Sequence, residues 1–257
     1  MSSSPVRYAP PKGYPLGTNW AFHIGAAVLR PILNLIVKKD WRGGEKLPKT
    51  GAAIVVCNHL SYLDPLTFTH FLYNNGRAPR YLGKEAVFKV PFIGWFLKSA
   101  GQIPVKRETK DAVVGFEHAI AVLEAGHLLG VYPEGTLTRD NNLWPMRAKT
   151  GVARLALLTG VPIYPCASWG PEKVIPPYGK KIKLFPRTKV SVSMGDPVDL
   201  SKWNGKSDPQ SIEAATEKIM DEITYLLEHL RGETAPKERF DPKLSNLPRT
   251  GNFRKSR

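Results

Sequence analysis

Residues 52–65 have the sequence AAIVVCNHLSYLDP, and the α/β interpretation of this chain starts from them. The first five residues are apolar and rich in β-branched side chains, which predicts a buried strand. Residues 66–72, LTFTHFL, predict a helix. A histidine and an aspartate therefore lie where a strand passes into a helix. Open α/β sheets bind their ligands just beyond the carboxyl ends of their strands, so this turn is a candidate functional site.

The two polar residues of interest in this turn are His59 and Asp64. A histidine can take up a proton near neutral pH, and a carboxylate beside it can hold the ring and stabilise its charged form. Residues five apart point about 140° away from each other on one helix, so the two side chains meet only if His59 lies in the non-helical turn. A purely structural interpretation stays open, because Asp64-Pro65 is also a common helix start and His59 could be a hydrogen-bonded core residue.

A second polar loop follows another predicted strand. Residues 127–130, HLLG, are mostly apolar, and residues 131–139, VYPEGTLTR, bring Glu, Gly, Thr and Arg. An ordinary turn can also contain Pro-Glu-Gly. Two strand-end loops, one with a base and the other with a carboxylate and a cation, nevertheless favour a single site between them.

Together these segments resemble the glycerophospholipid acyltransferase family, whose best-known members acylate 1-acylglycerol-3-phosphate. Asn58, His59 and Asp64 match the first motif of that family, which is Asn-His followed by four residues and Asp. Residues 132–136 match part of its third motif, Phe-Pro-Glu-Gly-Thr-Arg-Ser. Motifs of this kind are informative when they occur at the expected ends of strands.

Two further blocks extend the resemblance. The second block of the family is similar to segments within residues 84–107, and the fourth is similar to residues 161–165, VPIYP. The four blocks keep their order and cover roughly residues 40–200. One departure concerns Leu137, which stands where the family usually has a phosphate-binding Arg. Arg139, two residues further on, is the candidate replacement.

The resemblance implies transfer of a fatty acyl group from acyl-CoA or acyl-carrier protein to the hydroxyl of 1-acylglycerol-3-phosphate, which gives phosphatidic acid. His59 would remove the hydroxyl proton, Asp64 would hold the ring, and backbone amides or Asn58 would donate to the oxyanion. The chemistry needs no metal or redox cofactor. The other predicted site residues would contact the acceptor and its phosphate: Glu134, Gly135, Thr136, Arg107, Lys84, Arg139 and Lys149.

Other functions remain open on these residues. First-step acylation of glycerol 3-phosphate, or acylation of a different lipid acceptor, would use the same His59 and Asp64. A non-catalytic basic protein that binds lipid or nucleic acid is the alternative of a different class, and the intact His59–Asp64 pair argues against it. A thiol nucleophile at Cys57 is another alternative, although a small buried residue is its expected role.

The composition fits a lipid enzyme with anionic partners. The 257 residues suffice for one α/β domain with extensions, and the net charge of +15 favours a phosphorylated lipid acceptor and an anionic membrane surface. No RNA-recognition, zinc-finger or basic-zipper signature accompanies this charge, so no nucleic-acid partner is expected. Two cysteines argue against a disulfide scaffold and fit a reducing cytosol, and no metal-ligand spacing occurs.

Residues 1–39 are predicted to form an N-terminal arm. Residues 1–17 are rich in Ser, Pro and Gly and lack the pattern of a secretory signal. Residues 19–39 predict an amphipathic helix with Pro31 as a potential kink, too interrupted by polar residues for a transmembrane span. Its apolar face either packs on the domain or lies in a membrane interface. The second case would place the protein on the cytoplasmic face of the cell membrane, as a peripheral or monotopic protein.

The rest of the chain alternates between predicted strands and helices. Strands are predicted at residues 80–83, 102–105, 161–167, 181–185 and 189–194, with the last two as a candidate hairpin, and helices at residues 111–125, 150–159 and 208–232. This alternation predicts an α/β fold with a mostly parallel central sheet flanked by helices. Residues 40–232 form the predicted acyltransferase domain, and residues 233–257 form a basic polar tail.

Overall fold

A computed structural model describes residues 16–105, 111–179 and 181–245 of the chain. Side chains are described throughout these ranges except at residues 111–113. The predicted phosphate ligand Arg107, the start of the N-terminal arm and the end of the tail lie outside the described residues.

The described residues form one seven-stranded sheet with the strand order β1-β7-β6-β2-β5-β3-β4. The strands are β1 (Val37–Arg42), β2 (Ala53–Cys57), β3 (Pro79–Lys84), β4 (Ile103–Val105), β5 (Leu128–Val131), β6 (Ile163–Trp169) and β7 (Thr188–Met194). All neighbouring strands run parallel except β6 and β7, which pair antiparallel. The predicted α/β fold with a mostly parallel sheet is confirmed.

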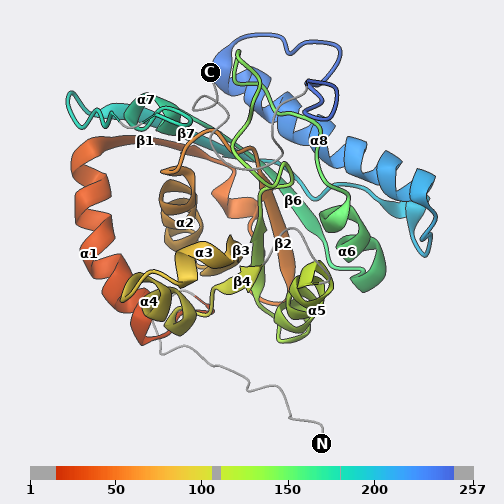
Figure 1. The fold of residues 1–257 in the computed structure, drawn as a ribbon, viewed down its shortest axis with the longest axis horizontal. Helices are drawn as coiled ribbons and strands as arrows, with labels where there is room; N and C mark the ends of the chain where they lie inside the picture. The colour runs from red at the N-terminus through yellow and green to blue at the C-terminus, as the bar shows by residue number, and fades with distance from the viewer. Residues whose placement is uncertain (1–15, 106–110, 180, 246–257) are drawn as a thin grey trace, which may run out of the picture.

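Helices cover both faces of this sheet (Figure 1). They are α1 (Trp20–Ile36), α2 (Asp64–Asn74), α3 (Glu85–Phe88), α4 (Ile93–Ser99), α5 (Asp111–Glu124), α6 (Gly151–Thr159), α7 (Pro171–Val174) and α8 (Pro209–Arg231), with short 3-10 helices η1 (Gly44–Lys46) and η2 (Ser201–Trp203). The predicted helices at residues 66–72, 111–125, 150–159 and 208–232 are confirmed as α2, α5, α6 and α8.

The packing of the central strand β2 on both faces explains why its sequence is apolar throughout. Ile54 and Val56 pack into a core formed with α5, α6 and α8, whereas Val55 and Cys57 pack into a second core formed with α2. All residues of β2 are fully buried. A parallel strand covered on both faces has no solvent side, so its sequence shows a continuous apolar run instead of alternation.

Strand β1 is an edge strand that sequence analysis missed. It pairs with β7 in parallel, and its register places Val37 opposite Thr188. Its residues 38–42 are charged or partly exposed, and Asp40 forms an ion pair with Lys189 at 2.9 Å. Charged side chains are common on edge strands, where they hide the strand pattern. The predicted boundary between residues 39 and 40 falls inside this strand.

The predicted hairpin of residues 181–185 and 189–194 is wrong. The second segment is strand β7, but residues 181–185 are exposed and form no strand. Strands β1 and β6 occupy the two edges of β7, so neither edge is available to residues 181–185.

The first half of the predicted tail packs against the domain. Arg239 forms ion pairs with Glu217 and Asp221 of α8, and the backbone N–H of Arg147 donates to the carbonyl of Phe240 at 2.9 Å. Residues 233–245 therefore belong to the folded body.

Candidate active site

The His59 turn follows the carboxyl end of β2, the strand between β5 and β6. Nδ1 of His59 lies 2.9 Å from Oδ2 of Asp64. The same oxygen accepts the backbone N–H groups of Leu60 at 2.6 Å and Ser61 at 2.8 Å. Asp64 is the first residue of α2 and is fully buried, while the His59 side chain keeps 16% of its surface exposed. An Nδ1–H donated to Asp64 leaves Nε2 with a lone pair, which is the form that a general base requires.

The backbone of His59 is held by the loop after β5. Its N–H donates to Oε1 of Glu134 at 2.9 Å, and its carbonyl accepts the N–H of Thr138 at 2.8 Å. The two loops predicted to share a site are thus joined directly. Oε2 of Glu134 also accepts the N–H of Met146 at 3.0 Å, so this buried carboxyl ties together three segments of the chain. Burial raises the pKa of Glu134 to about 8.

The ring of His59 stacks on an aromatic residue that sequence analysis did not assign to the site. The Tyr132 ring lies 4.2 Å from the His59 ring, centroid to centroid, at an interplanar angle of 20°. Tyr81 supports Tyr132 from further away, at 6.0 Å and 9°. The hydrogen bond to Asp64 and the stack on Tyr132 together restrain the direction and the plane of the imidazole. The parallel register of β2 with β5 is the signal that could have found this residue, because it places the two strand ends side by side.

Asn58 does not have the geometry predicted for an oxyanion donor. Its side chain is fully buried, with Nδ2 donating to the carbonyl of Ser168 at 3.0 Å and Oδ1 accepting the Ser168 N–H at 2.8 Å. Both ends of the amide are therefore engaged by the backbone of β6. Asn58 connects the ends of β2 and β6 beneath the turn, and the oxyanion needs a different donor, such as a backbone amide.

Among the predicted phosphate ligands, Lys149 lies at the Glu134–Gly135 loop. Gly135 has φ +72°, and the position of a β-carbon on it would lie 3.0 Å from Cε and 3.3 Å from Nζ of Lys149. The N–H of Lys149 donates to the carbonyl of Pro133 at 2.9 Å, which fixes the base of this side chain. The side chain of Lys149, an exposed residue, therefore lies over the glycine turn, and Thr136 follows in the same loop, partly buried.

Arg139 and Lys84 differ from Lys149 in burial or in strand position. Arg139 is buried, at 2% exposure, and Leu137 is buried too, with its carbonyl accepting the hydroxyl of Tyr178 at 2.8 Å. Lys84 is exposed at the carboxyl end of β3, which is separated from β2 by β5. The sequence pattern did not reveal that Lys149 is exposed whereas Arg139 is buried.

The chemistry of Cys57 does not favour a nucleophile. Both Cys57 and Cys166 are free and buried. Burial raises the pKa of the Cys57 thiol well above its ordinary value. Because the thiolate is the reactive form, the side chain next to the His59 turn behaves as a small core residue.

A family model described as Acyltransferase matches residues 39–169, just over half of the 257 residues. The chain belongs to the acyltransferase family. The matched range contains the His59 turn, the loop after β5 and Lys149, and it ends at the last residue of β6. The family resemblance found in the sequence is confirmed.

Several related acyltransferases have a more specific name. The chain is 33% identical over 141 residues to the chloroplast 1-acyl-sn-glycerol-3-phosphate acyltransferase BAT2 of Brassica napus, covering 54% of this chain but only 39% of that protein. It is 27% identical over 210 residues to the 1-acyl-sn-glycerol-3-phosphate acyltransferase of Bacillus subtilis, covering 78% and 94%. The crystal structure of the 1-acyl-sn-glycerophosphate acyltransferase PlsC from Thermotoga maritima is similar at 25% identity and a TM-score of 0.57, covering 81% and 82%.

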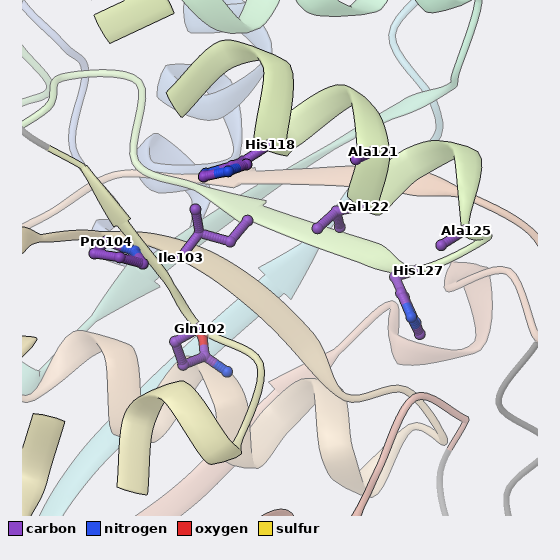
Figure 2. Close-up of a pocket in the computed structure, with 8 residues that line it drawn as sticks. All are labelled: Gln102, Ile103, Pro104, His118, Ala121, Val122, Ala125 and His127. Carbon is purple, nitrogen blue, oxygen red and sulfur yellow. The ribbon is translucent and has the colours of Figure 1, made fainter. Parts of the chain in front are cut away.

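This acyltransferase has a shallow apolar hollow away from the His59 turn (Figure 2). It lies between α5 and the edge strand β4, with Gln102, His118 and His127 among its lining residues. None of the predicted site residues lines it. Within the described residues, no group of three or more His, Cys, Asp or Glu side chains is arranged to hold a metal ion.

Proposed function

We propose that this acyltransferase transfers a fatty acyl group from an acyl thioester to the hydroxyl of 1-acylglycerol-3-phosphate, giving phosphatidic acid. The observation that carries the proposal is the partly exposed His59 ring, which lies 2.9 Å from the buried Asp64 carboxylate. The names of the relatives from Brassica napus, Bacillus subtilis and Thermotoga maritima support this choice of acceptor.

In the proposed reaction, Nε2 of His59 takes the proton of the acceptor hydroxyl while the oxygen attacks the thioester carbonyl. The tetrahedral intermediate then expels the thiolate, which receives the proton from His59, so the products are an ester and a free thiol. A positioned base contributes roughly 10²–10⁴-fold to such a step. Asp64 stabilises the imidazolium that forms between the two proton transfers, and Tyr132 keeps the ring in plane.

The proposed donor is acyl-CoA or acyl-carrier protein, and the reaction uses no cofactor. A thioester is already activated toward an oxygen nucleophile, so a base and an oxyanion donor are sufficient. The transfer is direct, because the buried Cys57 thiol is a poor nucleophile.

The phosphate of the acceptor is proposed to lie over the Gly135 turn, next to Nζ of Lys149. Lys149 is an exposed residue, and its Nζ lies 3.3 Å from the position that a β-carbon on Gly135 would take. Arg107 and Lys84 remain candidates for a second contact. The buried Arg139 is assigned a weaker role, because only 2% of its surface is exposed to a ligand from solvent.

A membrane surface is proposed as the place of reaction. Helix α1 has an outer face of exposed apolar side chains, which are Trp20, Ile24, Val28, Ile32 and Leu35. Their spacing of three and four residues forms one stripe along the helix. No helix within the described residues is long and apolar enough to cross a bilayer. We therefore assign α1 to the interface of an anionic membrane, with the protein bound peripherally on the cytoplasmic face of that membrane.

The function is tested by thiol release from palmitoyl-CoA and from palmitoyl acyl-carrier protein. Each donor is assayed without acceptor, with 1-acylglycerol-3-phosphate and with glycerol 3-phosphate. The proposal expects release that depends on 1-acylglycerol-3-phosphate and that is lost in His59→Ala. Release with glycerol 3-phosphate alone would assign the first acylation step instead, and no release with any acceptor would contradict the enzymatic assignment.

A further inference from the structure

The turn between α3 and α4 holds a large apolar side chain in an unusual backbone conformation. Phe92 has φ +60° and ψ −50°, and the N–H of Ile93 donates to the carbonyl of Pro91 at 2.6 Å. This is a γ-turn with positive φ at its centre, which is strained for a residue with a β-carbon. The Phe92 side chain is 87% exposed. A fold that needed only the turn would be served better by glycine at this position.

The turn is rigid, so Phe92 projects in a defined direction. A β-carbon on Gly94 would lie 1.9 Å from the carbonyl oxygen of Phe88, which means that only glycine lets α4 pack this closely on the end of α3. The N–H of Gly94 also donates to the carbonyl of Val90 at 2.8 Å. The close packing restrains both ends of the turn that carries Phe92.

The apolar surface around Phe92 is continuous with the outer face of α1. Trp95, 61% exposed, contacts Trp20 with ring centroids 5.4 Å apart. The Phe96 ring lies against Gly25 of α1, where a β-carbon would be 3.0 Å away. Figure 1 shows α4 beside the N-terminal half of α1. Other exposed apolar side chains near the turn are Val87, Val90 and Ile93. Contiguous apolar surface of this extent marks a protein or membrane interface.

The charges around this surface select an anionic partner. Residues 16–39 and 86–105 contain no Asp or Glu. They contribute exposed cations instead: Arg30, Lys38, Lys39, Lys89 and Lys98. Lys89 lies 3.3 Å from Glu85, the one acidic residue at the start of α3. Aromatic and aliphatic side chains surrounded by cations match the interface of a bilayer with anionic headgroups.

We propose that the α3–α4 turn is a second membrane-inserting element, with Phe92 and Trp95 entering the interface of an anionic phospholipid bilayer beside α1. The inference rests on the proposed function, because it assumes a lipid substrate at the membrane. One helix lying on a surface leaves the protein free to roll about the helix axis, and a second contact beside it removes that freedom. Leu33 of α1 packs with Leu63 of the His59 turn. The two contacts therefore fix the orientation of the catalytic turn relative to the bilayer.

The test compares Phe92→Gly and Trp95→Ser with wild type in co-sedimentation with vesicles of phosphatidylcholine and phosphatidylglycerol. Each single variant should raise the vesicle Kd about tenfold, the change expected when one large apolar side chain no longer leaves water. Phe92→Gly should also keep or raise Tm, because glycine relieves the positive φ. A structural role for the Phe92 side chain predicts the opposite change in Tm. Phe92→Asn, which tolerates positive φ without the added chain freedom of glycine, is the second variant.

Leu158→Ser is the matched control, because Leu158 is exposed to 64% on α6, which packs on the other face of the sheet. It should bind vesicles like wild type. The proposal is overturned if the Phe92 and Trp95 variants bind as tightly as wild type, or if wild type binds no vesicles. Acyl transfer by wild type to a short-chain, water-soluble acceptor needs no vesicle. If wild type transferred no acyl group to this acceptor, the proposed function would be contradicted. The vesicle measurements would still decide the membrane proposal on their own.

Discussion

The His59 turn holds its polar groups by hydrogen bonds, whereas the outer face of α1 and the α3–α4 turn present apolar side chains to solvent. In the His59 turn and the adjoining loop after β5, Asp64, Asn58 and Glu134 are buried and each accepts at least one backbone N–H. On the outer face of α1 and in the α3–α4 turn, Trp20 and Phe92 are exposed to 50% and 87%. Proton transfer requires positions fixed to fractions of an ångström, so it needs directional bonds. Membrane binding depends on the apolar surface area that leaves water, and this area changes little when individual side chains shift.

The largest expected effect is on the base. His59→Ala should lower kcat by roughly 10²–10⁴-fold, because no other group takes the hydroxyl proton. Asp64→Asn should be nearly as damaging, since the imidazolium loses its charged partner. Single-turnover acyl transfer measures both. His118→Ala, an exposed histidine of α5, is the control and should retain wild-type kcat. Wild-type rates in folded His59→Ala would exclude the proposed base.

The corresponding change on the membrane side is to the outer face of α1. Val28→Asp combined with Ile32→Asp should raise the Kd for anionic vesicles about a hundredfold, because two apolar side chains leave the interface and two like charges enter it. The Tm should change little, since both side chains are exposed. Equal binding by this double variant and wild type in vesicle co-sedimentation would show that α1 does not anchor the protein.

A third change tests whether Lys149 or Arg139 binds the phosphate of the acceptor. Lys149→Ala should raise the acceptor KM at least tenfold and leave the donor KM nearly unchanged, because a hydrogen bond to a charged group contributes roughly 1.5–3 kcal/mol. Lys149→Arg should restore most of the affinity. Arg139→Ala is expected to lower Tm instead, because Arg139 is buried. An unchanged acceptor KM in Lys149→Ala would move the phosphate to another cation.

The stack beneath the base should have a smaller effect. Tyr132→Leu should lower kcat severalfold, because an aromatic pair contributes roughly 0.5–1.5 kcal/mol beyond its buried area. Tyr132→Phe keeps the stacked ring and should behave like wild type. The split between kcat and KM is the deciding readout: loss of the ring should lower kcat and leave both KM values nearly unchanged, and an unchanged kcat would assign Tyr132 to packing alone.

The smallest expected effect is a pH dependence of stability. Burial raises the pKa of Glu134 to about 8 and that of Glu172 to about 7, both from an ordinary value of 4.5. At a pH between 4.5 and the raised pKa of each carboxyl, the folded protein holds a proton that the unfolded chain has released. The free energy of unfolding therefore falls as pH rises through this range. Burial lowers the pKa of His70 to about 4 and also lowers that of His127, which opposes this trend only below about pH 6.5.

Thermal unfolding should therefore show a falling Tm from pH 6.5 to beyond pH 8, with a shallower fall in Glu134→Gln. The glutamine cannot ionise, which removes one of the two carboxyls from the linkage. A slope in Glu134→Gln equal to that of wild type would show that Glu134 stays ionised in the folded protein, as its two backbone donors would favour.

The elements that were predicted correctly are those whose signals are local. Strand β2 has an uninterrupted apolar run, and α8 begins after Asp208, whose Oδ1 accepts the N–H of Ser211, and ends at Gly232 in the left-handed conformation. The elements that were missed depend on distant partners. Strand β1 is paired to β7, about 150 residues further along the chain, and its charged residues give no strand pattern.

The amino-acid sequence by itself determined the α/β alternation, the strand-to-helix turn with His59 and Asp64, and membership of the acyltransferase family. Each of these rests on residues close together in the chain, where periodicity and spacing carry the information. Only the tertiary structure decided that Asn58 bonds to Ser168, that Lys149 lies over Gly135 while Arg139 is buried, and that Phe92 projects beside α1. These facts depend on which strand ends and helix faces meet in space, and spacing along a motif does not encode which side of the backbone becomes buried.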